Sequence, residues 1–325
     1  MTSWQGRSVL VTGCTGFLGG ALTRALIERG AEVVGLVRDS VPRCNFFAER
    51  LADRVNVVHG ALENYDAVDR AINEYGVDTV FHLAAQAIVG VANRNPTSTF
   101  EANIKGTWVL LEACRRNPAV KTIVVASSDK AYGAHGELPY QEHFPLQGRH
   151  PYDVSKSCAD LIALSYAHTY GLPVSITRCG NLFGPGDLNY NRIVPGTLRA
   201  IFQGVRPVIR SDGTPVRDYV YVGDIVEAYL LLAERMGEPG IAGRAFNFGT
   251  GEPVSVRDLF ARILKAADRE DLEPIVENVA NSEIERQYLS STDAERLLGW
   301  RPGAGLDARL QTSADWYRAH HQRLS

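Results

Sequence analysis

The sequence predicts an α/β protein in which a doubly wound parallel sheet is joined to a smaller C-terminal α/β lobe. Three observations predict this class. Short apolar runs alternate with longer helical patterns through the first half of the chain, an order typical of βαβ units. The connections between these runs are short, as α/β turns usually are. Beyond about residue 178 the pattern changes, because glycine and proline become dense.

The expected strands are of the fully buried type, since their apolar residues follow one another without alternation. They are Ser8–Thr12, Glu32–Val37, Val55–His59, Thr79–Leu83, Thr122–Ser127 and Val174–Thr177. The helices expected between them are Phe17–Arg29, Tyr65–Tyr75, Phe100–Arg116 and Tyr152–Tyr170. Further along, the helical patterns Ile225–Arg235 and Val256–Ala267 are separated by loops. These later elements indicate a smaller lobe, some of whose segments return to the sheet.

The composition excludes several classes of protein. Hydrophobic residues make up 45% and charged residues 22% of the 325 residues, which is typical of a globular chain. The net charge of −3 gives no basic footprint for nucleic acid, and no apolar run approaches the ~20 residues of a membrane helix. The five cysteines form no CxxC pair. We therefore expect no metal site, reduced thiols and a cytoplasmic protein.

A glycine-rich turn follows the first expected strand and opens the first expected helix. Gly13 allows the tight turn, Gly16 lets the backbone approach a pyrophosphate, and Gly19 permits close packing of helix on strand. The N-terminus of the helix then offers free N–H groups and a positive dipole end to the phosphates. The turn therefore predicts a dinucleotide site. We expect a dinucleotide-binding domain over residues 1–178 and a mainly substrate-binding lobe over residues 179–325, with some segments returning to the first domain.

A tyrosine and a lysine stand four residues apart in one expected helix. Tyr152 and Lys156 therefore lie on the same face of that helix. A phenol with a pKa of about 10 is a poor base at neutral pH, so it needs a nearby cation, which Lys156 supplies. Ser128 follows the strand Thr122–Ser127, upstream of this helix. The three residues are candidates for base, cation and hydrogen-bonding partner of a hydroxyl group.

In this order, the glycine turn, the serine and the tyrosine–lysine helix resemble the short-chain dehydrogenase/reductase superfamily. The GxxGxxG spacing resembles its extended class, the epimerases and dehydratases that act on nucleotide sugars (NDP-sugars). Further segments fit this class and extend the resemblance from residue 8 to about residue 302. They are His82–Gln86, Asn103–Thr107, Arg178–Pro185, Val216–Asp224 and Leu298–Pro302. For His82 and Asn103 the resemblance implies a mainly structural role.

The resemblance implies that the enzyme oxidises a hexose C4 hydroxyl to a ketone, with Tyr152 as base. Ser128 would hydrogen-bond the sugar hydroxyl, and Lys156 would also bind the nicotinamide ribose. A 4-epimerase then returns the hydride to C4, whereas a 4,6-dehydratase removes the C5 proton, expels the C6 hydroxyl as water and delivers the hydride to C6. The second course needs an additional acid and base beside the sugar.

Asp129 and Lys130, directly after Ser128, are candidates for that acid and base. Asp followed by Lys resembles the CDP-glucose 4,6-dehydratases, and GDP-mannose 4,6-dehydratases are close neighbours; epimerases typically carry small uncharged residues at both positions. The resemblance thus favours an NDP-hexose 4,6-dehydratase that forms an NDP-4-keto-6-deoxyhexose. The alternatives are an NDP-sugar 4-epimerase, in which Asp129 and Lys130 form an exposed ion pair, and a non-catalytic dinucleotide-binding regulatory protein.

The resemblance also implies the residues that bind each ligand. The catalytic set is Ser128, Asp129, Lys130, Tyr152 and Lys156. The cofactor set is Gly13, Gly16, Phe17, Leu18, Gly19, Arg38, Asp39, Leu62, Leu83, Ala84, Ala85, Tyr152 and Lys156. The substrate set is Gln86, Asn181, Arg192 and Arg217, with Arg217 expected on the pyrophosphate.

The cofactor is expected to stay tightly bound and to be regenerated in each cycle. Members that use NAD⁺ usually place Asp at the end of the second strand, where this chain has Val37 followed by Arg38 and Asp39. Arg38 suits the 2′-phosphate of NADP⁺, but Asp39 would repel it, so NAD⁺ is preferred over NADP⁺. Ala61 also departs from the family, which usually has an Asp there that contacts adenine.

The expected partners are an NDP-sugar and a second copy of the chain, with no nucleic acid and no membrane. The helices Phe100–Arg116 and Tyr152–Tyr170 carry broad apolar faces. Their apolar residues include Trp108, Leu110, Leu111, Leu161, Ile162, Leu164 and Tyr166. In the class that the chain resembles, the matching helices form a four-helix contact, so a homodimer is expected.

Overall fold

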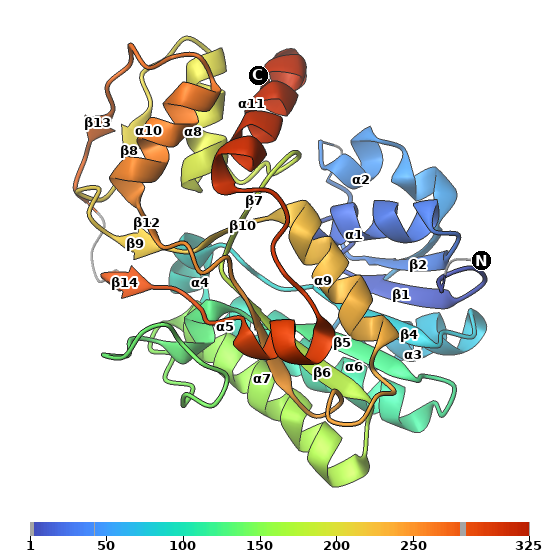
Figure 1. Ribbon diagram of the computed structural model, residues 1–325. Coiled ribbons are helices and arrows are strands. Elements are labelled where there is room, and N and C mark those ends of the chain that lie inside the picture. The colour runs from blue at the N-terminus through green and yellow to red at the C-terminus, as the bar shows by residue number, and fades with distance from the viewer. Residues whose placement is uncertain (1–2, 42, 280–283, 325) are drawn as a thin grey trace.

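A sheet of seven parallel strands forms the centre of the molecule. The computed structural model describes residues 3–41, 43–279 and 284–324 (Figure 1). The strands run in the order β11 (Ala245–Phe248), β6 (Val174–Cys179), β5 (Thr122–Ala126), β4 (Thr79–His82), β1 (Ser8–Thr12), β2 (Glu32–Val37) and β3 (Asn56–His59). The order reverses beside β1, where β2 and β4 flank it on opposite sides, and such a switch point is where ligands bind in open α/β sheets. The predicted doubly wound sheet is confirmed.

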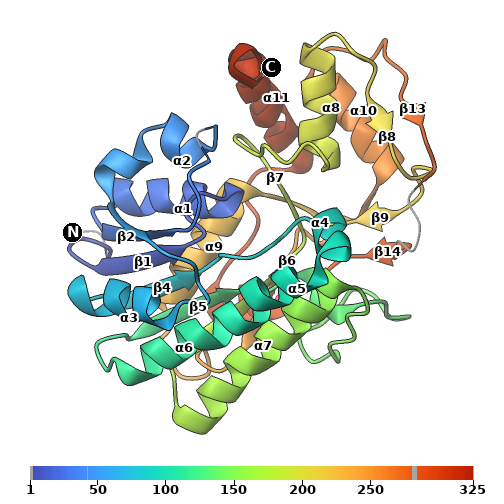
Figure 2. The same cartoon turned by 180° about the vertical axis from the view of Figure 1, so that it is seen from behind.

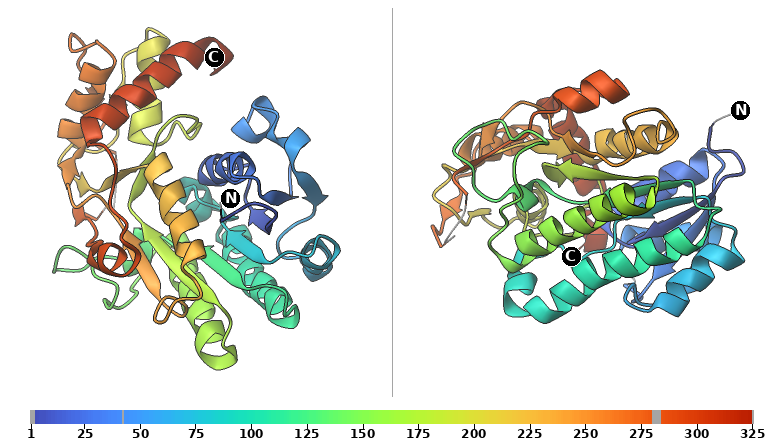
Figure 3. Two further views of the ribbon diagram at one scale, coloured as in Figure 1. Left: turned by 45° about the vertical axis from the view of Figure 1, so that its right-hand side comes forward. Right: turned by 90° about the horizontal axis from the view of Figure 1, so that it is seen from below.

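Helices cover both faces of this sheet. One face packs against α1 (Phe17–Glu28) and α9 (Val222–Glu234), which lie in front in Figure 1. The other packs against α3 (Tyr65–Glu74), α6 (Gly106–Arg116) and α7 (Pro151–Tyr170), which lie in front in Figure 2. Figure 3 shows the sheet between the two layers when seen from below. Successive strand residues serve opposite layers: Val9 and Val11 join the α1 side, and Leu10 the α6 side.

The expected helix Phe100–Arg116 belongs to a longer run of helical turns. It begins with α5 (Pro96–Phe100), continues through a π-helical segment η2 (Glu101–Lys105) and ends as α6. The start lies earlier than predicted because Asn95 caps α5, its side chain accepting from Ser98 N at 3.1 Å, and proline occupies the first position. Other short helical segments before residue 135 are α2 (Asn45–Ala48), η1 (Leu51–Arg54), α4 (Val89–Arg94) and η3 (Asp129–Tyr132).

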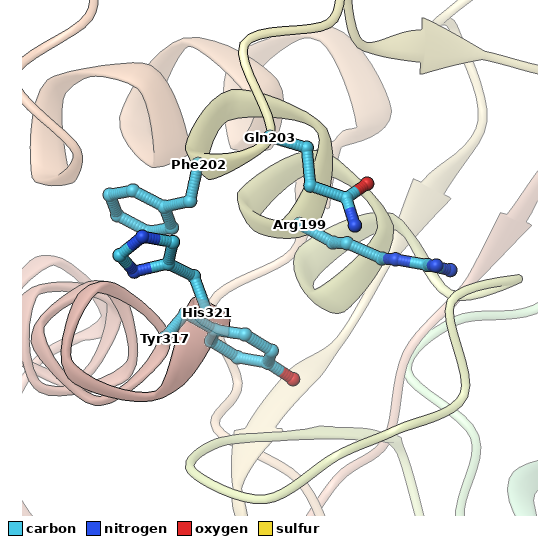
Figure 4. Close-up of a pocket in the computed structure, with 5 residues that line it drawn as sticks. All are labelled: Arg199, Phe202, Gln203, Tyr317 and His321. Atoms are coloured by element: carbon cyan, nitrogen blue, oxygen red, sulfur yellow. The ribbon is translucent and has the colours of Figure 1, made fainter. Parts of the chain in front are cut away.

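The C-terminal lobe has a core of its own. Three helices form it: α8 (Ile193–Phe202), α10 (Val256–Ala266) and α11 (Leu306–Leu324). The lobe also contains three small sheets. In these sheets β7 (Asn181–Phe183) pairs with β10 (Tyr219–Tyr221), β8 (Val208–Ile209) pairs with β13 (Ile275–Val276), and β9 (Val216–Arg217) lies between β12 (Val254–Ser255) and β14 (Arg286–Gln287). A small pocket between α8 and α11 is lined by Phe202, Tyr317 and His321, among others (Figure 4).

Parts of the chain beyond residue 178 also pack on the central sheet. The helix α9 covers one face, β11 forms an edge, and the π-helical segment η4 (Ala294–Leu298) joins the same hydrophobic cluster. The division of the chain at residue 178 stays a prediction. Within the described residues, no helix is long and apolar enough to cross a membrane, and no cluster of His, Cys, Asp or Glu side chains is arranged to hold a metal ion.

The apolar faces proposed for a dimer are only partly open. Leu110 and Leu111 are fully buried within the chain, so they do not belong to an outer face. Trp108 on α6 and Leu161 on α7 are 42% and 57% exposed. The sequence pattern did not separate the two groups, because a helix that packs on a sheet is also apolar toward its neighbouring helix.

Candidate active site

One continuous cleft connects the glycine turn with the C-terminal lobe. It begins at the carboxyl ends of β1, β4, β5 and β6. In open parallel sheets, ligands bind at this edge, where loops follow the strands. Every residue proposed from the sequence for catalysis, cofactor binding or substrate binding lines this cleft. The structure therefore brings all of them together, while the role of each stays a prediction.

The glycine turn is built from close backbone approaches. Gly13 has a φ of +75°, and a Cβ atom placed on it would lie 2.7 Å from the main-chain nitrogen of Ala84. A Cβ on Gly19 would lie 2.0 Å from the carbonyl oxygen of Gly13. At Gly20 the nearest atom would be 3.4 Å away, an ordinary contact. Gly13 and Gly19 are thus required by geometry, and Gly20 is not.

A buried histidine supports the segment that faces this turn. The hydroxyl of Thr107 donates to a main-chain carbonyl one turn earlier at 2.6 Å, so it must accept from Nε2 of His82 at 3.0 Å. Nδ1 of His82 then accepts from the hydroxyl of Thr12 at 2.9 Å, and the oxygen of Thr12 accepts the N–H groups of Leu83 and Ala84, both at 3.2 Å. Burial lowers the pKa of His82 to about 3, which keeps the ring neutral.

Asn103 links three parts of the cleft wall. Its Oδ1 accepts from the main-chain nitrogen of Gln86 at 2.7 Å, and its Nδ2 donates to the carbonyl of Gln86 at 3.1 Å and to Ser155 Oγ at 2.9 Å. Ser155 in turn donates to the carbonyl of Tyr152 at 2.7 Å. The π-helical segment therefore positions both the loop after β4 and the first turn of α7. These contacts fit the structural role expected for Asn103.

The residues of the turn fit a dinucleotide. The helix α1 begins after Gly16 with no side-chain cap, so its first N–H groups are available to phosphate oxygens at the cleft. At the end of β2, Arg38 and Asp39 are exposed and form an ion pair at 2.6 Å. The side chain of Asn45 on α2 reaches across and donates to the carbonyl of Gly186 at 2.8 Å, which ties α2 to a loop of the C-terminal lobe.

Tyr152 and Lys156 project from the first turns of α7 toward the end of β5. Burial raises the pKa of Tyr152 to about 12, opposed by its hydrogen bond with Ser128 and by the charge of Arg192. Burial lowers the pKa of Lys156 to about 8, which the carboxylate of Asp160 partly offsets. The ammonium group of Lys156 donates to the carbonyl of Ala126 at 2.7 Å. The lysine is thus held beside the strand end that leads into Ser128.

Asp129 and Lys130 form a partly enclosed ion pair beside Ser128. Their side chains are 4% and 23% exposed, and Lys130 Nζ lies 3.1 Å from Asp129 Oδ2. Ser128 donates to Asp129 Oδ1 at 3.1 Å and caps η3 by accepting the N–H group of Lys130 at 3.2 Å. The pair therefore faces the cleft with its aspartate withdrawn from solvent, and it is not an exposed surface pair.

Distant residues hold this segment in place. Arg178 on β6 forms a buried bidentate pair with Asp160 at 2.8 and 2.9 Å and donates to the hydroxyl of Tyr132 at 2.8 Å. Tyr132 donates to Asn247 Oδ1 on β11 at 2.8 Å. Gln287 on β14 contacts both Asp129 and Lys130. Sequence reasoning missed Gln287, because only the tertiary fold places β14 beside η3.

Three of the four substrate candidates, Asn181, Arg192 and Arg217, come from the chain beyond residue 178. Arg192 pairs with the buried Asp187 at 2.9 Å, and its guanidinium lies 5.9 Å from the ring centre of Phe17 at the glycine turn. Arg217 is buried and donates to the carbonyls of Val216 and Glu285 at 2.9 and 3.3 Å. Within the described part of the chain, the buried Nδ2 of Asn181 has no hydrogen-bond partner, as expected of a donor reserved for a ligand.

This fold and this arrangement of Ser128, Tyr152 and Lys156 define a nicotinamide-dependent enzyme of the short-chain dehydrogenase/reductase type. The chain belongs to the NAD dependent epimerase/dehydratase family, which residues 9–249 match. The resemblance inferred from the sequence is thereby confirmed.

Known relatives include both dehydratases and epimerases of sugar nucleotides. The CDP-glucose 4,6-dehydratase of Salmonella typhimurium is 30% identical over 332 residues, covering 97% of this chain and 92% of that protein. The UDP-glucose 4-epimerase of Mycolicibacterium smegmatis is 30% identical, covering 96% of this chain and 99% of that protein. Among solved structures, the dTDP-glucose 4,6-dehydratase of Streptomyces venezuelae, with NAD bound, superposes with a TM-score of 0.86 at 28% identity, covering 98% of this chain and 100% of that chain.

Proposed function

We propose that the protein is an NDP-hexose 4,6-dehydratase, which converts its substrate to an NDP-4-keto-6-deoxyhexose and water. The observation that carries this proposal is the withdrawn Asp129–Lys130 pair beside Ser128 and Tyr152. An epimerase needs no further acid or base once the C4 ketone has formed, whereas elimination needs both.

The pair supplies one acid and one base after a single internal proton transfer. Passing a proton from the ammonium of Lys130 to the carboxylate of Asp129, 3.1 Å away, leaves a neutral amine and a carboxylic acid. The amine takes the C5 proton while the acid protonates the departing C6 hydroxyl, which leaves as water. The pair is then an ion pair again, and the proton on Lys130 is available to return to C5. No external acid or base is consumed.

The other residues act on the C4 hydroxyl. Tyr152 takes its proton, and Ser128 orients the oxygen through a hydrogen bond. The bound nicotinamide supplies hydride acceptance and return. Lys156, held on the Ala126 carbonyl, provides the positive charge that favours the phenolate of Tyr152.

NAD⁺ is the proposed cofactor. Directly after β2, Asp39 forms an ion pair with Arg38 at 2.6 Å; a carboxylate at this turn would repel a 2′-phosphate and can accept hydrogen bonds from a ribose diol instead. Denaturing the purified protein should release about one equivalent of NAD(H), since the hydride returns within one cycle. Recovery of NADP(H) instead would overturn this preference.

For the substrate, Arg217 and Asn181 are the proposed ligands of the pyrophosphate, Arg192 is a second candidate, and Gln86 lines the same cleft. A guanidinium suits phosphate because its planar fork donates paired hydrogen bonds. Replacing Arg217 by Ala should raise KM strongly without changing cofactor retention. An unchanged KM would remove Arg217 from the site.

The reaction is tested by product mass. Wild-type enzyme incubated with a panel of NDP-hexoses should lose water from one of them, and in D₂O the product should carry deuterium at C5. Asp129→Asn should stop water loss while still allowing oxidation at C4, so that reduced nicotinamide builds up. Tyr152→Phe, the matched control, should suppress both steps because no base remains for the C4 hydroxyl.

The second candidate is a 4-epimerase, favoured by the similarity to the Mycolicibacterium enzyme. It predicts a product of unchanged mass with inverted C4, no deuterium at C5 and tolerance of Asp129→Asn. This result would rule out the dehydratase proposal.

We also propose a homodimer through α6 and α7. The exposed Trp108 and Leu161 mark the face available for the contact. Light scattering at micromolar concentration tests it, and a monomer would rule it out.

A further inference from the structure

We propose that Gln287 is a positioning residue for the Asp129–Lys130 pair and that it connects this pair to the strand that carries Arg217. The proposal rests on the proposed dehydratase function. Gln287 lies far from η3 in the sequence, and it belongs neither to the glycine turn nor to the helix that carries Tyr152 and Lys156.

The amide of Gln287 bridges the two residues of the pair. Its Nε2 donates to the main-chain carbonyl of Asp129 at 2.9 Å, and its Oε1 accepts from Lys130 Nζ. The side chain is completely buried. Its orientation is fixed by chemistry, because the opposite flip would set an NH₂ group against an ammonium and an oxygen against a carbonyl. The contact therefore has a single satisfied arrangement.

This bridge restricts the direction of the Lys130 amine. An ammonium has three N–H donors, and two of them are taken by Asp129 and Gln287. The third position on the nitrogen is the one that can face the cleft, which Lys130 lines. Once the amine is neutral and has rotated about its Cε–Nζ bond, its two N–H groups can stay with Asp129 and Gln287 while its lone pair takes this third position and can accept the C5 proton. A neutral amide holds the amine in place without supplying a second carboxylate, so it does not compete with Asp129 for the proton.

The same residue is part of the substrate side of the cleft. In the small three-stranded sheet, Gln287 stands in register opposite Arg217. Arg217 also donates to the carbonyl of Glu285 on the chain leading into β14. A ligand that binds Arg217 therefore contacts the strand β9, which pairs with β14, and Gln287 on β14 in turn contacts Lys130. The proposed pyrophosphate site and the acid–base pair are thus connected through β14.

Gln287→Met tests this role, because methionine keeps the length and volume but loses both hydrogen bonds. We expect kcat for water loss to fall roughly 10²-fold, the cost of a misplaced catalytic group, with KM within about twofold of wild type. Reduced nicotinamide should accumulate, since Ser128, Tyr152 and Lys156 are untouched. Gln287→Asn keeps the amide on a shorter side chain, so its kcat should lie between those of wild type and Gln287→Met. It also serves as the second variant if Gln287→Met does not fold.

Tyr140→Phe is the matched control. Tyr140 is buried in the same region and pairs with Leu289, two residues beyond Gln287. Its hydroxyl donates to the carbonyl of Gly133 at 3.0 Å. Its removal should lower thermal stability and leave the split between reduced cofactor and product unchanged. If Tyr140→Phe reproduces the effect of Gln287→Met, Gln287 only stabilises the region and the proposal is overturned.

A second readout does not depend on the reaction. Trace labelling with acetic anhydride, read by peptide mass spectrometry, should acetylate Lys130 several-fold faster in Gln287→Met than in wild type, with the exposed Lys121 as internal reference. Unchanged labelling of Lys130, or unchanged kcat in an enzyme that does lose water, overturns the proposal. If wild type gives a product of unchanged mass, the dehydratase function fails, and the labelling alone decides whether Gln287 holds Lys130.

Discussion

The glycine turn and the Asp129–Lys130 segment both face the same cleft, but they are held in different ways. The turn is held by backbone: Gly13 and Gly19 touch main-chain atoms, and the opposing segment is fixed through Thr12 and His82 on neighbouring strands. The Asp129–Lys130 segment, here called the acid–base segment after its proposed role, is held by side chains from β6, β11 and β14. The expected cofactor site is thus built around one glycine turn and two neighbouring strands, whereas the segment proposed to supply an acid and a base depends on side chains from three strands that lie far away in the sequence.

The largest expected effect breaks the turn. In Gly19→Ala the new Cβ would lie 2.0 Å from the carbonyl oxygen of Gly13, so the turn must shift and we expect the protein to lose its bound dinucleotide. Gly20→Ala, on the same helix, meets nothing closer than 3.4 Å and should retain about one equivalent. Cofactor released on denaturation measures both. Equal retention would show that the turn tolerates side chains.

A smaller effect is expected at the support of the acid–base segment. Arg178→Met leaves the buried carboxylate of Asp160 without its partner, which should lower the free energy of unfolding by about 3–5 kcal/mol. Arg318→Met, in a pair with Asp268 that is 43% and 80% exposed, should cost less than about 1 kcal/mol. Urea unfolding measures the free energy of unfolding of both variants. Similar losses of this free energy would contradict the expectation that the buried pair stabilises the fold more than the exposed pair.

The smallest effect concerns the pH dependence of the turn's support. The pKa of His82 is 6.5 in its ordinary state and about 3 in the folded protein. Between pH 6.5 and pH 3, the unfolded chain therefore binds a proton at His82 that the folded chain does not bind. Stability should therefore fall as the pH drops from about 6.5 toward 3 and be unaffected above that range. Between pH 7 and pH 5 this contributes about 2 kcal/mol.

His82→Gln keeps one donor and one acceptor but does not titrate, so it is the matched variant. Its unfolding free energy should fall less than that of wild type between the two pH values. An identical fall in both proteins would mean that other groups dominate this range.

The fold was largely predictable because its signals are local. The six expected strands of the first half all occur in the sheet, since runs such as Ser8–Thr12 must be buried on both faces. The π-helical turn at Asn103 and the strand β11 were not predicted, because tertiary contacts define them. Likewise the candidate cleft residues were found from motifs, whereas Gln287 was not identified from the sequence, because only the pairing of β14 with β9 places it at the cleft.

The position of β11 at the edge of the central sheet has a consequence for exchanging parts between relatives. Phe246 and Phe248 of this strand are fully buried, and Phe248 packs edge-on against Trp300 at 5.0 Å. Trp300 also donates to the carbonyl of Asp224 on α9 at 3.1 Å. A chimera joined once, at residue 178, would therefore take both α9 and β11 from the donor and force a foreign strand onto β6. Exchanges that alter sugar or base preference should instead leave residues 222–248 and 294–300 with the host sheet.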